Sequence, residues 1–409
     1  MKRGAKNLKI TFSGEKLTHF GGIYLLQKFF QRINLRSYLS QYIKFIQRNN
    51  HYSITEEILA LIYPIVLGLE RIETTHLLRR NGVFQYITGL PTYPNPTTLR
   101  RFLNRMTQTG LVKLRNLHDK LLLSMIIKPK PPKAVIFDLD STVLTLYGKQ
   151  EGAEIGYNPK KKGRASYHPL LCFNGITKDF WHGELRYGNT HTATGVIDLL
   201  KACFDKLPYS TNTVIIRADK GFYDHDTVEY LEDKKSLFVI VSKLTKPLKW
   251  KLHNLSYKRY TSGTETAEFK YQPIKWKKEY RFIVIRRTIP EESSEQLTLF
   301  KIGSYTYQVL VTNIKLNPLN IWKFYNKRAG VELLIKELKE SYPLGKIPTK
   351  HFTANETYFH ILLFSYNLIN WFKRLCLPKE FRNLTLKTLR TRFLLILGEL
   401  TKTNNKPTL

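Results

Sequence analysis

Apolar residues in the first 130 positions recur at helical spacing. Residues 17–33 and 54–69 each place apolar side chains along one face of an amphipathic helix. Ser53, with Glu56 three residues later, has the pattern of a capping box and marks the start of the second helix. We therefore predict a helical N-terminal region over residues 1–130.

A short basic helix is expected after the turn at residues 93–97, where Pro94 and Pro96 force the turn and Asn95 or Thr97 can cap a helix. Its apolar side carries Leu99, Phe102, Leu103 and Met106, and its polar side carries Thr98, Arg101 and Arg105. A helix with an apolar back and an arginine-rich front suits contact with a DNA groove or with phosphates. An exposed basic helix in a bundle has the same pattern, so Arg101 and Arg105 are candidate DNA contacts.

The pattern changes after a linker rich in proline and lysine at residues 128–133. Apolar runs at 134–140 and 213–219 each end in aspartate and have the pattern of buried strands. Further strands are expected at 143–147, 167–175, 179–186 and 237–241, and helices at 193–204 and 224–233. Three consecutive strands followed by helix, strand, helix and strand predict an α/β fold, with a mixed sheet and helices on both faces. We assign residues 131–242 to the first part of this core.

Residues 243–316 are dense in Lys, Arg, Trp and Tyr, and strands are expected at 281–287 and 305–312. This segment is predicted to be a β-rich insertion. Long helices are expected beyond it at 320–338 and 357–375, within a second core segment at 317–385. A terminal helix at 386–397 and a polar tail complete residues 386–409.

Two acidic residues, Asp140 and Asp219, lie at the ends of the apolar strands. The carboxyl ends of strands in an α/β sheet are where ligand sites form, and a buried charge there needs a partner such as a cation. Asp138 shares a strand face with Asp140, because alternate strand residues point the same way. We favour Asp140 as the first ligand, with Asp138 as the alternative or as a supporting partner.

A third acidic residue lies in the helix expected at 320–338. On a continuous helix, Tyr325, Arg328, Glu332 and Lys339 project within an arc of about 60°. This places two cations, a phenol and a carboxylate on one stripe of an otherwise apolar helix. An exposed polar stripe with an Arg328–Glu332 ion pair is the competing interpretation.

The charge composition of the chain indicates what kind of molecule it binds. The chain has 66 Lys and Arg against 32 Asp and Glu, which gives a net charge of 66 − 32 = +34. Such an excess indicates a polyanionic partner, although lysine spread over the surface without a function gives the same total. Cys172, Cys203 and Cys376 lack metal-ligand spacing, which argues against a zinc module or a disulfide scaffold. No apolar run is long enough to span a bilayer and no signal-peptide core follows the N-terminus, so we expect a cytoplasmic protein without a membrane partner.

The spacing Tyr325-x2-Arg328-x3-Glu332-x6-Lys339 resembles the Y-R-E-K signature of bacterial insertion-sequence transposases of the DDE class. Segments 138–142, 147–163, 186–191 and 217–223 resemble other blocks of that family and occur in the same order. Lys220 departs from the pattern, since small residues are more common at that place.

The resemblance implies a ribonuclease-H-like core whose catalytic and metal-binding residues are Asp140, Asp219 and Glu332, with Mg²⁺ (or Mn²⁺) as cofactor. Such transposases are similar in cutting double-stranded DNA at terminal inverted repeats and joining the 3′ ends to target DNA. Those with this signature are thought to release the element through hairpin ends. A homodimer in the synaptic complex is expected, because two transposon ends must be held together. The helical region 1–130 is the expected DNA-binding and dimerisation region, and the bacterial nucleoid is the expected place of action.

The residues themselves are compatible with this chemistry, because two-metal phosphodiester transfer needs oxygen ligands and no covalent protein nucleophile. Arg328 and Lys339 would bind phosphates, and Tyr325 could hydrogen-bond a phosphate or stack on a displaced base. Trp250 and Trp276 lie among lysines and are candidate platforms for a flipped base, unless they pack in a β core. Two alternatives remain: a non-catalytic domesticated transposase that regulates through repeat DNA, and a nuclease of the same fold.

Overall fold

The computed structural model describes residues 16–44, 51–90, 92–128, 130–288, 300–302, 304–404 and 406–409. The chain divides into two compact units, Met1–Leu117 with Lys339–Leu409, and His118–Leu338. The second unit is therefore inserted, in sequence, between the two parts of the first. The five functional segments expected from the sequence (1–130, 131–242, 243–316, 317–385 and 386–409) do not correspond one to one to these two units, and they stay a prediction.

The first unit is largely helical. Its N-terminal part contains α1 (Ile23–Arg32), α2 (Leu35–Tyr42), α3 (Ile54–Leu67), α4 (His76–Arg79), α5 (Gly82–Thr88), α6 (Pro96–Arg105) and the first half of α7 (Gln108–Ile126). The capping box is confirmed: the Ser53 side chain accepts from the Glu56 amide, and the Glu56 carboxylate accepts from the Ser53 amide. The α3 helix is buried on nearly every side, and it packs against the long helix α13 (Phe352–Cys376). This pair forms the centre of the helical core.

Helix α6 begins at Pro96, one of the two starts that the sequence left open, and it buries Leu99, Phe102 and Leu103. The Asn95 side chain does not cap the helix, because it accepts a hydrogen bond from Arg79 instead. The apolar back of this helix is thus confirmed.

The C-terminal end of the first unit departs from the single helix expected at 386–397. Helix α14 spans only Leu386–Leu389 and is followed by one π-helical turn, Arg390–Leu394. The Arg390 guanidinium donates to the Ile65 carbonyl oxygen at 2.8 Å, and Leu395 N bonds back to the Arg390 carbonyl oxygen at 2.8 Å, which widens the turn and ends the helix. Beyond it lie β15 (Gly398–Glu399), paired with β1 (Leu17–Thr18), and the hairpin of β16 (Thr401–Thr403) and β17 (Lys406–Thr408). No helix in the described parts of the chain is long and apolar enough to cross a membrane.

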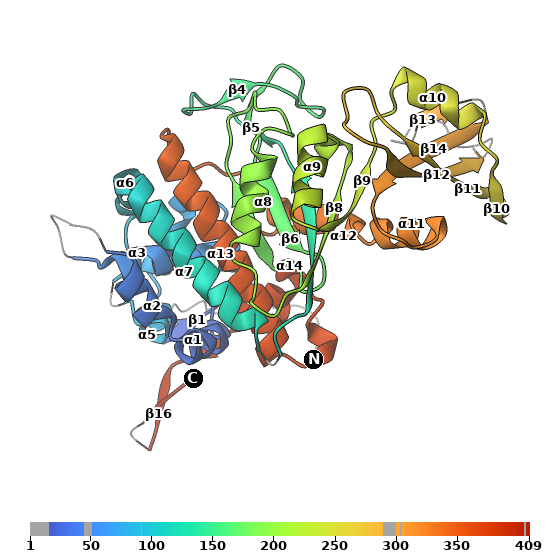
Figure 1. Ribbon diagram of the computed structural model, residues 1–409. Coiled ribbons are helices and arrows are strands. Elements are labelled where there is room, and N and C mark those ends of the chain that lie inside the picture. The colour runs from blue at the N-terminus through green and yellow to red at the C-terminus, as the bar shows by residue number, and fades with distance from the viewer. Residues whose placement is uncertain are drawn as a thin grey trace, which may run out of the picture. The chain divides into compact units, whose positions relative to one another are not determined.

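The second unit is built on a mixed sheet. Its core strands are β2 (Ala134–Ser141), β6 (Leu170–Asn174), β7 (Phe180–Glu184), β8 (Thr213–Ala218) and β9 (Leu237–Val241), in the spatial order β7-β6-β2-β8-β9. The first three strands along the chain are antiparallel, whereas β8 and β9 run parallel to β2. Helices α8 (Val196–Phe204) and α9 (His225–Asp233) make the crossovers and lie side by side on one face of the sheet (Figure 1). The predicted ribonuclease-H-like α/β class is confirmed.

The chain between β2 and β6 forms a separate small sheet, which we call the flap (residues 142–167). It contains β3 (Leu144–Thr145), β4 (Glu154–Ile155) and β5 (Ala165–Tyr167), in the order β3-β5-β4. The strand expected at 143–147 is therefore short and outside the main sheet, because the chain leaves that sheet after Ser141.

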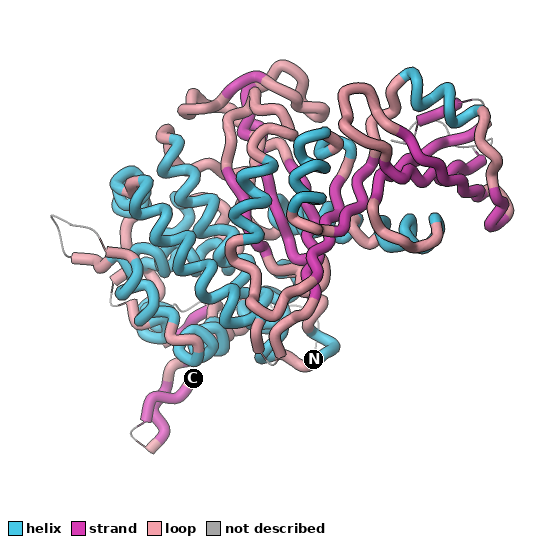
Figure 2. Tube along the Cα trace, in the orientation of Figure 1, coloured by secondary structure: helices cyan, strands magenta, loops and turns pink. Residues whose placement is uncertain are grey.

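The insertion extends the main sheet. It contains α10 (Lys246–His253), β10 (Lys258–Thr261), β11 (Thr264–Tyr271), β12 (Tyr280–Thr288), β13 (Phe300–Ile302) and β14 (Tyr305–Thr312). Strand β14 pairs antiparallel with β9, with Leu310 opposite Val241, so the strands continue without a break from the core into the insertion (Figure 2). Helix α11 (Pro318–Asn326) packs its Ile321 and Tyr325 against Ile283 and Ile285 of β12.

The single helix expected at 320–338 is wrong at its centre. Helix α11 ends at Asn326, and α12 (Ala329–Glu340) begins three residues later. The main-chain bonds at the break span three residues instead of four: Arg328 N to Tyr325 O and Val331 N to Arg328 O, both 2.8 Å. Gly330, a poor helix former, follows directly. Because the helix is interrupted between Asn326 and Ala329, the 60° stripe calculated for a continuous helix does not describe the real arrangement.

Candidate active site

The first two candidate carboxylates leave the sheet at the same edge, because β2 and β8 are neighbouring parallel strands. Asp140, near the end of β2, is 9% exposed, and Asp219 directly follows β8. The Asp219 carboxylate caps the 3₁₀ turn Lys220–Phe222 by accepting from Gly221 N at 2.8 Å. A Cβ on Gly221 would lie 2.8 Å from the Thr192 methyl carbon, so glycine lets the turn approach this closely. The turn thus fixes the direction of the Asp219 carboxylate.

Glu332 supplies the third carboxylate, from the first turn of α12. Arg328 lies between two of the three acids: its Nη2 is 3.4 Å from Asp140 Oδ2, and its Nη1 is 3.5 Å from Glu332 Oε1. The arginine side chain is 3% exposed, whereas that of Glu332 is 68% exposed. Arg328 therefore links the buried carboxylate to the solvent-facing one.

The guanidinium of Arg328 is also fixed to the main chain. Its Nη2 donates to the carbonyl oxygen of Leu139 at 2.8 Å. Burial lowers the pKa of Arg328, but the charge of Asp140 and of the other nearby acids outweighs burial and leaves that pKa raised. Arg328 is consequently a permanent cation that ties the start of α12 to the end of β2.

Asp140 is close enough to the other two carboxylates for their charges to affect its pKa. Burial raises the pKa of Asp140 to about 6; Arg328 and the Ser141 amide oppose the rise, and the charges of Asp219 and Glu332 add to it. The Ser141 amide donates to Asp140 Oδ1 at 2.8 Å. The negative charges of Asp219 and Glu332 near the buried Asp140 favour a bound cation, and carboxylate oxygens are donors that fit Mg²⁺ or Mn²⁺. These residues thus fit a divalent-metal site.

A cavity of about 610 Å³ opens beside the acids. Its lining includes Asp219, Tyr325, Arg328 and Glu332. The insertion contributes Tyr307, Gln308 and Val309 of β14. Burial raises the pKa of Tyr325 to about 12, so its hydroxyl remains a hydrogen-bond donor at neutral pH. The cavity therefore contains two candidate metal-binding carboxylates, Asp219 and Glu332. It also contains a phenol, Tyr325, that can donate a hydrogen bond to a phosphate.

Asp138, the alternative first metal ligand, forms a buried ion pair with Arg217. Its two oxygens accept from Arg217 Nε at 2.6 Å and from Arg217 Nη2 at 2.8 Å, and both residues are 1% exposed. Arg217 Nη1 also donates to the Phe324 carbonyl oxygen at 2.8 Å, which attaches α11 to the strands. A Cβ on Gly175 would come within 2.7 Å of Arg217 Nη2, so glycine provides the space for this pair. The geometry thus favours Asp140 over Asp138 at the carboxylate cluster.

Sequence reasoning missed Arg217. It lies opposite Asp138 in the β2–β8 register, two residues before Asp219, just as Asp138 lies two residues before Asp140. The sequence did contain a sign of this pair, because an acid and an arginine each stand two residues before the terminal aspartate of a buried strand.

The candidate DNA contacts on helices are distributed over both units. Lys339 is exposed on the last turn of α12, and Arg101 is exposed on α6. Arg105 Nη2 lies 3.1 Å from Glu57, a carboxylate whose side chain is 2% exposed, so this arginine neutralises a buried acid.

The two candidate tryptophans differ sharply. Trp250 on α10 is 72% exposed. Trp276 is 8% exposed; it stacks on Tyr223 with ring centroids 5.1 Å apart and meets Tyr280 edge-on. Trp276 therefore has the packing role that the sequence left open, and Trp250 keeps an accessible ring.

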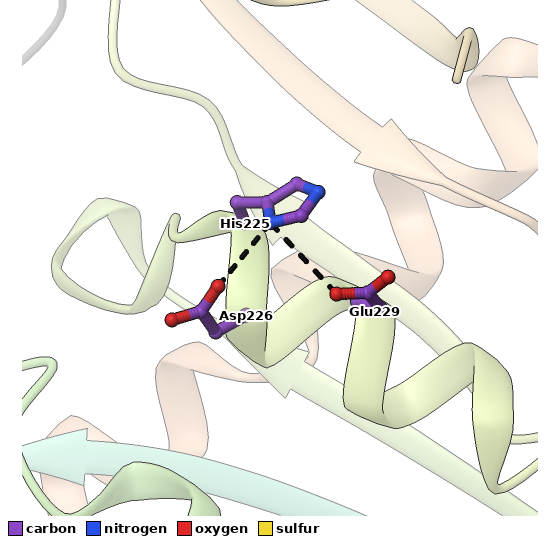
Figure 3. A group of neighbouring side chains, drawn as sticks. All are labelled: His225, Asp226 and Glu229. Atoms are coloured by element: carbon purple, nitrogen blue, oxygen red, sulfur yellow. Dashed lines mark hydrogen bonds and ion pairs between the residues drawn. The ribbon is translucent and has the colours of Figure 1, made fainter. Parts of the chain in front are cut away.

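A second group of metal-ligand types lies on α9 (Figure 3). His225 Nδ1 is 3.2 Å from Asp226 Oδ1 and 4.0 Å from Glu229 Oε2. Glu229 is ion-paired with Lys277, and His225 packs edge-on against Trp276. These contacts account for the cluster, which is distinct from the carboxylates around Arg328.

We expect Asp140→Asn to stabilise the metal-free protein at pH 8. Asp140 has a pKa of about 6, above the ordinary value of about 4. The stability associated with its protonated form is therefore fully present below about pH 4 and is lost as pH rises through about 6. Asparagine removes that loss, which amounts to about 1–3 kcal/mol. Thermal unfolding between pH 4 and 8 measures it.

The matched control is Asp226→Asn, which changes a 75% exposed carboxylate and should leave the melting temperature unchanged. Added Mg²⁺ should raise the melting temperature of the wild type at pH 8 and that of Asp140→Asn much less. An Asp140→Asn protein with wild-type pH dependence and a wild-type response to Mg²⁺ would contradict this account of the site.

Comparison with known proteins identifies the family. Residues 2–409 match the family described as transposase DDE domain group 1. No sequence among curated proteins matches the chain. Among solved structures, a cryo-EM structure of a piggyBac transposase synaptic complex with hairpin DNA is similar, with a TM-score of 0.45 and 13% sequence identity over 96% of this chain and 90% of that chain. Since the family match extends over almost every residue, this chain belongs to the DDE transposases.

Proposed function

We propose that this DNA transposase binds the terminal inverted repeats of a mobile element, cuts the DNA there and joins the 3′ ends to target DNA. Membership of the family implies a DNA-cleaving enzyme, and the use of divalent metal ions by DDE transposases supports a metal-dependent reaction here. The observation that carries the proposal is Arg328, which lies between Asp140 and Glu332 and lines a solvent-accessible cavity together with Glu332 and Asp219.

We assign the metal-binding role to these three carboxylates, with two Mg²⁺ (or Mn²⁺) ions as cofactors. When bound, such ions activate the attacking oxygen and stabilise the leaving oxygen of a phosphodiester. The protein holds the ligands in place: Gly221 N orients Asp219, Ser141 N orients Asp140, and Arg328 orients both Asp140 and Glu332. The exposed side of Glu332 leaves room for water and phosphate.

Tyr325 and the two cations are assigned to the DNA backbone. The Tyr325 hydroxyl remains protonated at neutral pH and lines the cavity, so it can donate to a phosphate oxygen. Arg328 is nearly buried, and its contacts with Asp140, Glu332 and Leu139 support a positioning role beside any phosphate contact. Lys339, on the exposed side of α12, would add a point charge along the DNA.

The decisive assay combines purified protein with duplex DNA carrying the element's terminal repeats. With Mg²⁺ the wild type should nick the repeat ends and join them to a target duplex, and EDTA should stop both steps. Cleavage without joining would instead identify a nuclease of the same fold. Binding without cleavage at any Mg²⁺ or Mn²⁺ concentration would identify a domesticated, non-catalytic binder.

The cut-and-paste route through hairpin ends belongs to the same proposal. A flipped base needs an accessible aromatic face with a cation nearby, and Trp250, flanked by Lys249 and Lys251, is 72% exposed. We expect Trp250→Ala to slow hairpin resolution by about tenfold, given a stacking contribution of roughly 1–3 kcal/mol per base. Gel analysis of hairpin intermediates measures it.

Trp276→Ala serves as the comparison, because it removes a packed ring and should chiefly lower the melting temperature. Normal hairpin resolution in both variants would remove tryptophan from this step.

The partners in the proposal are the repeat duplex, the target duplex and a second copy of the chain. Arg101 and Arg105 on α6 are assigned to the duplex, with Arg105 also paired to Glu57. Two element ends must be cut together, so we propose a homodimer in the synaptic complex, acting on DNA in the bacterial cytoplasm. Mass measurement of the protein–DNA complex tests the stoichiometry.

A further inference from the structure

The flap lies at the edge of the sheet that carries the candidate carboxylates. Strand β2 ends at Ser141, one residue beyond Asp140, and the chain then forms the flap before it returns as β6. Thr142 N bonds to Pro169 O at 3.1 Å, which closes the base of the flap beside that edge. Figure 1 shows β4 and β5 beyond the ends of the core strands, so the flap projects from this edge.

The outer surface of the flap is basic and aromatic. Residues 142–167 contain five Lys and Arg and two Glu, a net charge of 5 − 2 = +3. The basic side chains of Lys160, Lys161, Lys162 and Arg164 are exposed, and none forms an ion pair with an acid in the described parts of the chain. Tyr147 and Tyr157 are 72% and 73% exposed, so their rings contribute little to any core. Basic and aromatic side chains interleaved in this way are typical of nucleic-acid surfaces.

The basic loop is held in a fixed shape from within. Asn158, 5% exposed, donates to Thr145 Oγ1 at 3.1 Å and accepts from Lys161 N at 3.0 Å. Gly163 turns the chain at a φ of +72°, a conformation that side chains disfavour. The charges are therefore presented by a preformed loop, which lowers the entropy lost on binding.

The flap is also fixed to the rest of its unit. A Cβ on Gly156 would lie 2.1 Å from the Gly188 carbonyl oxygen, so the two backbones are in direct contact there. The Tyr167 hydroxyl donates to the Glu151 carbonyl oxygen at 2.6 Å. The flap is thus a rigid small sheet with exposed tyrosines and lysines, which are the properties expected of a binding surface.

We propose that the flap binds the phosphate backbone of the DNA segment that reaches the carboxylate cluster, beside the bond to be cut. This inference rests on the proposed function, since it gives that DNA a second contact surface. Lys160, Lys161 and Lys162 supply the phosphate contacts, and Asn158 positions their loop.

The test compares two triple variants that remove the same charge. The flap variant is Lys160→Ala/Lys161→Ala/Lys162→Ala. The control is Lys128→Ala/Lys130→Ala/Lys133→Ala, which changes lysines just before β2, at the opposite end of the strand that carries Asp140. Binding to a terminal-repeat duplex is measured from about 50 to about 200 mM salt, where each lost phosphate contact lowers the slope of log affinity against log salt by about 0.9.

Loss of three phosphate contacts should make the salt slope of the flap variant shallower by about 2.7. When salt rises fourfold, the affinity of the flap variant should therefore fall by a factor roughly 40 times smaller than the factor for the wild type. The control variant should keep a slope near the wild-type value. Asn158→Ala, which retains every charge, should weaken binding at low salt.

Equal slopes for the flap variant and the control would overturn the inference. If the wild type cuts repeat DNA while the two triples bind alike, only the flap assignment fails. If the wild type neither binds steeply with salt nor cuts, the proposed function itself fails. Circular dichroism and thermal unfolding establish that both triples are folded, which is expected because the replaced side chains are exposed.

Discussion

Asp219→Asn is expected to reduce DNA cleavage on the order of 10³-fold or more while leaving duplex binding intact. In the proposed function Asp219 holds the catalytic metal. Loss of such a carboxylate removes transition-state stabilisation, and effects of this size are usual for central catalytic groups. Asparagine retains an oxygen that can accept from Gly221 N, so the turn after β8 should keep its shape. A labelled repeat duplex with Mg²⁺ reports cleavage, and a mobility-shift titration reports binding.

The control for this experiment is Asp224→Asn, five residues further along the same loop. Asp224 caps α9 by accepting from Thr227 N at 3.3 Å, which asparagine can also do. That variant should keep cleavage near the wild-type rate. Full strand-transfer activity in Asp219→Asn would show that the carboxylate assignment is wrong.

The second large effect is expected from the buried pair of Asp138 and Arg217. Removing one partner of a fully buried, doubly hydrogen-bonded ion pair leaves an uncompensated charge and costs about 3–5 kcal/mol. Arg217→Ala also frees the Phe324 carbonyl oxygen, which releases the end of α11 that precedes Tyr325. Urea unfolding should show the loss of stability, and the cleavage assay should show a lower rate.

A double variant separates stability from positioning. Asp138→Leu/Arg217→Met replaces both charges with apolar groups, so it should recover much of the stability lost by Arg217→Ala. It does not restore the bond to Phe324, and cleavage should therefore stay low. Asp198→Asn, which breaks the exposed pair of Asp198 with Lys201, should change stability by less than about 1 kcal/mol. Full activity in the double variant would show that the pair has only a structural role.

Local sequence patterns predicted the strands and their terminal acids well. The apolar run at 134–140 is β2, and the strand expected at 237–241 is observed at those residues. A run of apolar residues and the acid that ends it can both be read from a few neighbouring positions. No knowledge of the rest of the fold is needed to place them. The choice between Asp138 and Asp140 was different, because it depends on which side chain of the neighbouring strand faces each acid. Arg217 faces Asp138 only through the parallel register of β2 and β8.

The helix carrying the third acid shows the limit of periodicity. Tyr325, Arg328 and Glu332 fit one continuous helix on spacing alone, yet the main chain tightens at Arg328. Besides the nearby Gly330, a distant partner acts at this break, since Arg328 bonds to the Leu139 carbonyl oxygen, 189 residues away in sequence. Tertiary contacts of this kind override local propensity and leave no local signature.

The pairing of β14 with β9 has a consequence for how the chain survives in a crowded cell. In a bare five-strand core, β9 would expose a row of unpaired amide and carbonyl groups, which is a template for association with other chains. The insertion covers that row, and the outermost strand of the extended sheet becomes β10, whose residues Lys258 to Thr261 are all exposed and include two cations. Charged, short outer strands resist edge-to-edge association. A shortened chain without the insertion would therefore be prone to aggregate during expression, before any effect on DNA cutting could be measured.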